Sequence, residues 1–199
     1  MNRISKRLLD ILGSLFGIIL TSPILLISAI AIKLDSKGPV FFKQERLGEN
    51  GKVFNIIKFR TMVDNAEKMG SGIITYENDP RITRVGNILR KTSLDELPQL
   101  FNVLKGDMSL VGPRPPVPYH PKKYEEYPEN QKKRFIVKPG ITGYAQVNGR
   151  NNLTWDDRIE LDVQYVENFN ILLDLKIIFL TIVKVIKSED VHSTDVKKK

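Results

Sequence analysis

The chain has 199 residues, which is enough for one domain with its own hydrophobic core and short for two. It contains no cysteine, which excludes disulfide frameworks, cysteine-ligated metal centres and thiol catalysis, and its two histidines, His120 and His192, lie too far apart in sequence to indicate a histidine-rich metal site. The formal net charge of +8 indicates anionic partners; because the basic residues are scattered among apolar stretches, phosphates and membrane lipid fit better than nucleic acid, which is not expected as a partner.

An apolar segment near the N-terminus, residues 8–34, carries no charge between residues 11 and 32. It is long enough to cross a bilayer core, which takes about 20 apolar residues, and longer than the roughly 7 to 15 residues of a signal-peptide core. Both flanks of the segment are basic, with Arg3, Lys6 and Arg7 before it and Lys33, Lys37 and Lys43 after it. Because basic flanks favour the cytoplasmic side, both ends are expected there.

Ser22 and Pro23 interrupt the middle of this segment. A proline removes one backbone hydrogen bond and clashes with the preceding turn, which predicts a kink. The Ser22 hydroxyl can bond a backbone group that Pro23 releases, which lowers the cost of bending in lipid. A re-entrant hairpin over residues 1–37 would keep both basic flanks on one side of the membrane, whereas an ordinary transmembrane anchor would separate them. Composition alone does not decide between the two.

The next part of the chain predicts a β-hairpin and a loop. Apolar and polar residues alternate over residues 40–62 around Asn50-Gly51, and Asn-Gly is a strong hairpin signal. Residues 63–78 are expected to form a loop that covers the functional site of the domain. The proline-rich stretch at residues 112–121 can be neither regular helix nor central strand, so it predicts an extended loop.

Helices are predicted between these loops and in the last third of the chain. Apolar residues at helical spacing predict helix in pieces over residues 82–104. Ser93 is expected to cap the second piece in a capping box with Glu96, which places the adjacent carboxylates of Asp95 and Glu96 beside the positive end of a helix. Two further helices are predicted from residue 155 to about 168 and from 171 to 186. The second is mostly apolar and fits the membrane interface and a buried core position equally well.

The predicted fold class is α+β, mainly helical with a small β-hairpin and interfacial amphipathic helices, and the two basic flanks favour an N-terminal re-entrant membrane helix. Residues 1–37 are expected to form the membrane hairpin, residues 38–188 a cytoplasmic domain that packs on the membrane interface and would carry any catalytic site, and residues 189–199 a polar tail.

Without cysteine or clustered histidine, the candidate groups for chemistry are carboxylates, hydroxyls and lysines. An aspartate carboxylate can attack phosphorus, and phosphoryl transfer needs positive charge around the transferred group, from arginine, lysine or a divalent cation. The basic residues in the most constrained contexts are Lys58, Arg60, Arg90 and Arg114. Taken singly, the Asp95-Glu96 pair is explained better by helix capping, and each basic residue by a place on the solvated surface.

Four motifs in order change this interpretation: KFRTM at residues 58–62, SLDELPQL at 93–100, SLVGPRP at 109–115 and KPGITGYAQVNGR at 138–150. Together they resemble the bacterial sugar transferase family, the monotopic phosphoglycosyl transferases that begin capsule, exopolysaccharide and glycoprotein glycan assembly. The likeness spans essentially the whole chain, and the length of the chain resembles that of the minimal catalytic form of the family.

The resemblance implies a magnesium-dependent, ping-pong reaction at the cytoplasmic face of the bacterial inner membrane. Asp95 would attack the β-phosphate of a UDP-sugar, UMP would leave, and the aspartyl phosphosugar would pass to undecaprenyl phosphate. Glu96 would assist through the metal or by handling a proton, with Asp95 and Glu96 as the Mg²⁺ ligands. Arg90 and Arg114 are then the expected diphosphate contacts, with Lys58 and Arg60 near the site. Ser22-Pro23 is the expected break in the membrane helix.

Other classes of protein remain as alternatives. A noncatalytic, membrane-tethered basic adaptor would bind anionic lipid or nucleic acid, but it leaves the placement of Asp95 and Glu96 unexplained. A polytopic phosphosugar transferase would need many membrane-spanning segments, and the sequence has one such segment. The sequence is compatible with a homo-oligomer and distinguishes neither the sugar nor the glycan pathway.

Overall fold

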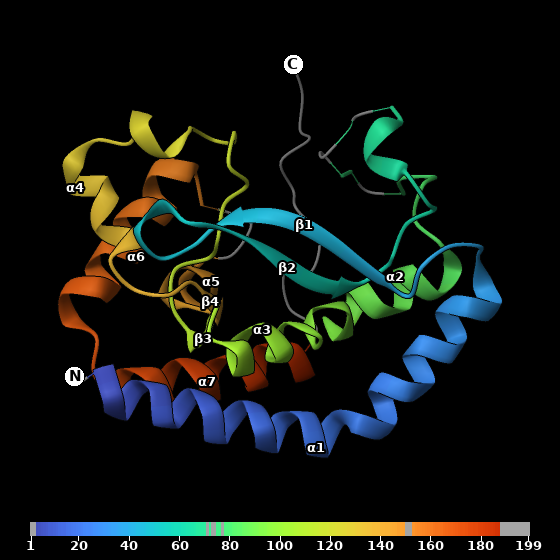
Figure 1. Cartoon of the computed structure of the whole chain (residues 1–199), viewed down its shortest axis with the longest axis horizontal. Coiled ribbons are helices and arrows are strands. Elements are labelled where there is room, and N and C mark those ends of the chain that lie inside the picture. The colour runs from blue at the N-terminus through green and yellow to red at the C-terminus, as the bar shows by residue number, and fades with distance from the viewer. Residues whose placement is uncertain (1–2, 71, 73–74, 77, 150–152, 188–199) are drawn as a thin grey trace.

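The computed structural model describes residues 3–187 apart from residues 71, 73–74, 77 and 150–152. The predicted polar tail at residues 189–199 lies outside the described residues. Helices predominate, which confirms the predicted α+β, mainly helical class, and the strands form two small two-stranded sheets (Figure 1). Short 3-10 turns occur at Glu49–Gly51, Ala66–Lys68, Leu94–Glu96, Tyr124–Glu126 and Lys133–Phe135.

The apolar N-terminal segment forms one long helix, α1 (Arg3–Asp35), with Pro23 inside it. Figure 1 shows that α1 bends between its two halves. The Ser22 hydroxyl donates to the Ile19 carbonyl at 2.8 Å, the acceptor that an amide at position 23 would otherwise bind, so the expected role of Ser22 is confirmed. The bend therefore lies within a continuous helix, and the two arms predicted over residues 1–37 are halves of one element rather than helices joined by a turn.

Both halves of α1 are tied to the rest of the domain. In the first half, Arg7 donates to the carbonyls of Val103 and Leu104 at 2.6 and 2.7 Å, near the end of α3 (Gln99–Lys105). At the other end, Asp35 accepts a hydrogen bond from the amide of Val85, in the first turn of α2 (Arg84–Lys91). The domain therefore sits in the concave side of the bent helix (Figure 1).

The predicted hairpin is confirmed. Strands β1 (Phe41–Leu47) and β2 (Val53–Phe59) pair antiparallel. Between them, Asn50 and Gly51 adopt left-handed backbone conformations with φ of 55° and 73°, which asparagine and glycine tolerate better than other residues. The side chains of β1 alternate between exposed and half-buried, so one face of the hairpin covers the domain interior.

A second, parallel sheet was not predicted. It pairs β3 (Ser109–Val111) with β4 (Gly140–Thr142), two strands from the motifs SLVGPRP and KPGITGYAQVNGR. The two backbones approach so closely that a Cβ on Gly140 would lie 2.1 Å from the amide nitrogen of Gly112, which only glycine allows. This sheet fixes the start of the proline-rich loop.

Helices α6 (Trp155–Asn168) and α7 (Ile171–Ile186) agree closely with the predicted ones. The short helices α4 (Glu129–Lys132) and α5 (Tyr144–Asn148) were not predicted. Helix α7 is buried on one side and exposes apolar side chains on the other, so it has features of both a core helix and an interfacial helix. Ile177 is buried in a core cluster with Val111 and Tyr165, whereas Leu172 and Phe179 are 77% and 65% exposed.

Candidate active site

The candidate site is a cleft of about 1270 Å³ beneath the hairpin. It is bordered by β2, by described residues between 60 and 79, by α2 and by the turn Leu94–Glu96, and it extends to Thr181 and Val185 of α7. All six residues proposed for chemistry from the sequence line it, namely Lys58, Arg60, Arg90, Asp95, Glu96 and Arg114. The structure thus brings together residues that are far apart in the chain.

Glu96 is the most tightly held of these side chains. Its Oε1 accepts from the Lys58 ammonium group at 2.6 Å and from the Arg114 guanidinium group at 3.0 Å. Burial opposes ionisation of Glu96, but the charges of Lys58 and Arg114 outweigh it and hold the pKa of Glu96 well below its ordinary value. Glu96 is therefore a carboxylate at all physiological pH values.

The capping box expected at Ser93 is wrong. Ser93 has a φ of 56°, whereas a capping residue usually has an extended backbone, and it makes no side-chain capping bond. Asp95 and Glu96 lie in the 3-10 turn Leu94–Glu96 that precedes α3, and the Glu96 carboxylate is used by the cations of the cleft instead.

A buried asparagine, which the sequence analysis missed, aligns Lys58 with this turn. Asn102 of α3 accepts from the amide of Ile57 at 2.9 Å and donates to the carbonyl of Asn55 at 2.8 Å, so its carboxamide completes the edge of β2. Because α3 directly follows the turn that carries Glu96, Asn102 fixes the distance between Lys58 and Glu96. Its sequence signal was a polar residue between the apolar residues Phe101 and Val103.

Asp95 differs from its neighbour. Within the described part of the chain, its carboxylate takes part in no hydrogen bond or ion pair. Burial and the charge of Glu96 raise the pKa of Asp95 to about 6, against the opposing charges of Lys58, Arg90 and Arg114. At neutral pH Asp95 is thus an ionised carboxylate without a fixed partner, which is the condition of a nucleophile or a metal ligand.

The two other predicted cations have different environments. Arg90 lies near the end of α2, lines the cleft and favours the ionised form of Asp95. Arg60 is 5% exposed and donates to the carbonyls of Ser36, Lys37 and Pro39 at 2.6 to 2.9 Å. These bonds fix the chain where it leaves α1. The structure therefore gives Arg60 a structural role, and we do not assign it to substrate binding.

Arg46 of β1 lines the cleft and was missed from the sequence. Its guanidinium group donates to the Pro115 carbonyl at 3.0 Å and to the Gln44 side chain. Burial and the neighbouring charge of Arg114 lower the pKa of Arg46 to about 10, so it stays charged at neutral pH. The available signal was its place in the strand, because alternation puts Arg46 on the same half-buried face as Phe42 and Gln44.

The carboxylate pair fits a hard divalent cation. No group of three or more acidic, histidine or cysteine side chains that could hold a metal occurs among the described residues. The unpaired Asp95 carboxylate and the second oxygen of Glu96 are nevertheless oxygen ligands of the kind that Mg²⁺ takes, since Mg²⁺ commonly uses one or two carboxylates together with substrate phosphates and water. The residues present therefore fit Mg²⁺.

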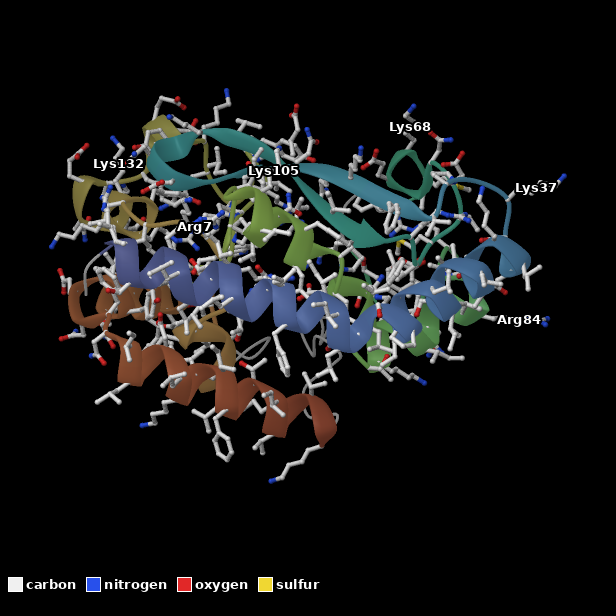
Figure 2. All side chains as sticks on the ribbon, turned by 60° about the horizontal axis from the view of Figure 1, so that its bottom comes forward. Arg7, Lys37, Lys68, Arg84, Lys105 and Lys132 are labelled. Atoms are coloured by element: carbon white, nitrogen blue, oxygen red, sulfur yellow. The ribbon has the colours of Figure 1, made fainter. Side chains whose placement is uncertain are left out.

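An apolar face lies on the side of the molecule opposite the hairpin. Helices α1 and α7 run side by side there (Figures 1 and 2), and Lys6 of α1 donates to Asp174 of α7 at 2.7 Å. α1 is long and apolar enough to cross a membrane. Many of its large apolar side chains are exposed, as are several on α7, among them Leu12, Phe16, Ile19, Leu20, Ile27, Leu172, Phe179 and Ile182.

Comparison with known proteins places these features in a family. The model of the family described as bacterial sugar transferase matches residues 1–188. An uncharacterized sugar transferase of Bacillus subtilis (strain 168) is 48% identical over 193 residues, which cover 96% of this chain and 92% of that protein.

Two named transferases are similarly close. A UDP-glucose:undecaprenyl-phosphate glucose-1-phosphate transferase of Klebsiella pneumoniae is 49% identical over 191 residues, covering 92% of this chain and 40% of that protein. A UDP-N-acetylgalactosamine-undecaprenyl-phosphate N-acetylgalactosaminephosphotransferase of Aeromonas hydrophila is 46% identical over 180 residues, covering 89% of this chain and 42% of that protein. The chain thus spans less than half of these two relatives. On the family match and these identities, the chain belongs to the bacterial sugar transferase family.

Proposed function

We propose that the chain is a phosphoglycosyl transferase that moves a sugar 1-phosphate from a UDP-sugar to undecaprenyl phosphate, in the first step of capsule, exopolysaccharide or glycoprotein glycan synthesis. The names of the Klebsiella and Aeromonas relatives support the two substrates. The observation that carries the proposal is the pairing of Glu96 with Lys58 and Arg114 beside an Asp95 carboxylate that has no such partner.

The proposed reaction has two displacements at one phosphorus atom. In the first, an Asp95 oxygen forms a bond to the β-phosphorus, the bond from that phosphorus to the bridging oxygen breaks, and UMP leaves with the electron pair. In the second, a phosphate oxygen of undecaprenyl phosphate attacks the same phosphorus and the bond to Asp95 breaks. The products are the lipid diphosphosugar and the free Asp95 carboxylate.

The cations of the cleft supply the electrostatic part of this proposal. Arg90 and Arg114 would contact the diphosphate, and Lys58 keeps Glu96 ionised and in place. Mg²⁺, held by Asp95 and Glu96, would neutralise charge on the diphosphate when bound. Asp95 needs no base to activate it, because it is already ionised at neutral pH.

The lipid substrate accounts for the apolar face. Undecaprenyl phosphate keeps its hydrocarbon chain in the bilayer, and exposing that chain to water would cost about 0.8 kcal/mol per CH₂ group. The cleft extends to Thr181 and Val185 of α7, the helix that also presents apolar side chains outward. We infer that α1 enters the membrane from the cytoplasmic side, turns back at Ser22-Pro23, and sets the cleft at the lipid surface.

Mass spectrometry of the purified protein tests the proposal. Wild type, Asp95→Asn and the control Asp156→Asn, which changes an exposed residue of α6, are incubated with Mg²⁺ and UDP-glucose, UDP-galactose or UDP-N-acetylgalactosamine without acceptor lipid. We expect a phosphosugar adduct on residue 95 in wild type and control and none in Asp95→Asn.

Two results would contradict this mechanism in different ways. Lipid-linked product formed with acceptor present, but no adduct with any donor, would mean direct transfer, with Asp95 acting as a metal ligand. If undecaprenyl phosphate and membranes gave neither lipid-linked product nor UMP with any donor, the adaptor alternative would replace the proposal.

A further inference from the structure

Arg114 depends on an unusual loop for its position. Its side chain is 44% exposed, so packing alone does not hold it over Glu96. It lies in the sequence Pro113-Arg114-Pro115-Pro116, in which the three prolines have no amide hydrogen to donate. Such a segment cannot be fixed by its own regular secondary structure, and its backbone is left with four carbonyl groups and the single amide of Arg114 to anchor it.

All four carbonyls of this segment accept hydrogen bonds from other parts of the chain. The Gly140 amide donates to Pro113 at 3.0 Å and the Leu47 amide donates to Pro116 at 2.9 Å. Between them, two arginine side chains bond the carbonyls nearest the site: Arg134 donates to Arg114 at 2.9 Å, and Arg46 donates to Pro115 at 3.0 Å. Each carbonyl group of residues 113–116 is therefore fixed by a hydrogen bond from outside the loop.

The two arginines are themselves anchored. Arg134 forms a buried ion pair with Asp162 of α6, in which both side chains are 2% exposed and the Nε to Oδ2 distance is 3.1 Å. Arg46 is held on β1 and also donates to Gln44. A guanidinium group carries several donors, so each arginine can bond its anchor and the loop carbonyl together.

We propose that Arg46 and Arg134 are positioning residues for Arg114, which they hold over Glu96 and the reacting diphosphate through the carbonyl groups of the loop. The inference rests on the proposed function, because it takes Arg114 as a contact of the diphosphate. Its physical basis is that a misplacement of about 1 Å at a reacting centre can cost about a hundredfold in rate.

The test is whether these residues act through Arg114. The variants are Arg46→Met and the double change Arg134→Met with Asp162→Asn, each made in wild type and in Arg114→Ala. The double change removes both members of the buried pair, because removal of one would leave an uncompensated charge. The control is Lys133→Met, which changes an exposed lysine beside Arg134. The readouts are kcat and KM for UDP-sugar and the thermal unfolding midpoint.

In the wild-type background we expect kcat/KM to fall about tenfold to a hundredfold, as for the loss of one charged hydrogen bond. In Arg114→Ala the same changes should cost less than about threefold, because the group they position is gone. Arg46→Lys should restore most of the activity, since lysine can still donate to the Pro115 carbonyl. Lys133→Met should leave kcat/KM unchanged.

Equal fold-losses in the two backgrounds would overturn the positioning role and leave the proposed site intact. If Arg114→Ala alone left kcat/KM unchanged, both the positioning role and the place of Arg114 in the proposed site would be wrong. Should the Arg134 and Asp162 double change unfold the protein, Arg46→Met, which breaks no buried ion pair, decides the question by the same comparison.

Discussion

Asp95 and Glu96 are neighbours in the chain, yet their carboxylates are held in opposite ways. Glu96 receives two charged hydrogen bonds, from Lys58 at 2.6 Å and Arg114 at 3.0 Å, whereas Asp95 has none among the described residues. The cations hold the pKa of Glu96 low, and the resulting negative charge, together with burial, raises the pKa of Asp95. The turn thus combines one fixed anion with one carboxylate that is free to react.

Replacing Asp95 with asparagine should stabilise the metal-free protein at neutral pH. The pKa of Asp95 rises from 3.8 to about 6 on folding. Below pH 3.8 the side chain is protonated in both states and its burial costs no stability, whereas the free energy of unfolding falls as the pH rises through about 6 and the buried group ionises. Each unit of the shift corresponds to about 1.4 kcal/mol. In the presence of a chelator we expect Asp95→Asn to unfold several degrees above wild type at pH 7.5, and with no difference near pH 4.

Thermal unfolding followed across this pH range checks the prediction. Asp156→Asn, at an exposed position, should show no pH-dependent difference from wild type. If Asp95→Asn differed from wild type by the same amount at both pH values, the effect would not come from the ionisation of Asp95.

Lys58→Met should lower activity without unfolding the protein. Lys58 is one of two cations that keep Glu96 ionised, and its loss leaves the Glu96 carboxylate with Arg114 alone. We expect kcat/KM for the UDP-sugar to fall about a hundredfold, in the range found for loss of one preorganised charged group. Lys52→Met, at an exposed position beside the hairpin turn, is the matched control and should behave as wild type. Full activity in Lys58→Met would remove Lys58 from the site.

Local signals in the sequence were sufficient for the hairpin and most helices. Asn50-Gly51 specified the turn, and the 3.6-residue period specified α6 and α7, because these patterns depend on residues close together in the chain. The parallel pair β3 and β4 was beyond such reasoning. Each strand has three residues, too few for a period, and its partner comes from a distant motif.

The sequence predicted most charged residues of the candidate site but not their partners, and it missed Arg46 and Asn102. Motif order brought out Asp95, Glu96 and Arg114, whereas the capping box failed because Ser93 has a left-handed backbone and Lys58 and Arg114 bond the Glu96 carboxylate. Arg60 shows the same limit. The motif KFRTM puts it two residues from Lys58, but Arg60 follows the end of β2 and its guanidinium group bonds carbonyls of the loop after α1, which no local pattern predicts.

Arg60→Lys should therefore affect stability rather than catalysis. Lysine cannot reproduce the three directed bonds that Arg60 makes to Ser36, Lys37 and Pro39, and the carbonyls left unpaired are partly buried. We expect a loss of about 2 kcal/mol in the free energy of unfolding, measured by denaturant titration, with kcat and KM per folded molecule unchanged. A fall in kcat at unchanged stability would instead return Arg60 to the site.

Pro23→Ala should change how α1 sits in the membrane. Alanine restores the amide that bonds the Ile19 carbonyl, so the Ser22 hydroxyl is no longer needed there and the helix can straighten. A straight α1 cannot keep both the Arg7 contacts with α3 and the Asp35 contact with α2, because the domain holds the two halves at the bend. We therefore expect the variant to span the bilayer in part of the population and to lose transfer activity.

Because the chain contains no cysteine, single cysteines report the two sides directly. Ser5→Cys lies before the apolar segment and Glu45→Cys after it, both at exposed positions, and each is treated with a membrane-impermeant maleimide on intact cells and on inverted vesicles. With Pro23 present, both should react only in inverted vesicles; with Pro23→Ala, Ser5→Cys should become reactive from outside.

Reaction of Ser5→Cys from outside with Pro23 present would show that α1 spans the membrane, and it would overturn the re-entrant topology. If both cysteines stayed on the cytoplasmic side in Pro23→Ala, the contacts of α1 with the domain, rather than the proline, would be what holds the bend.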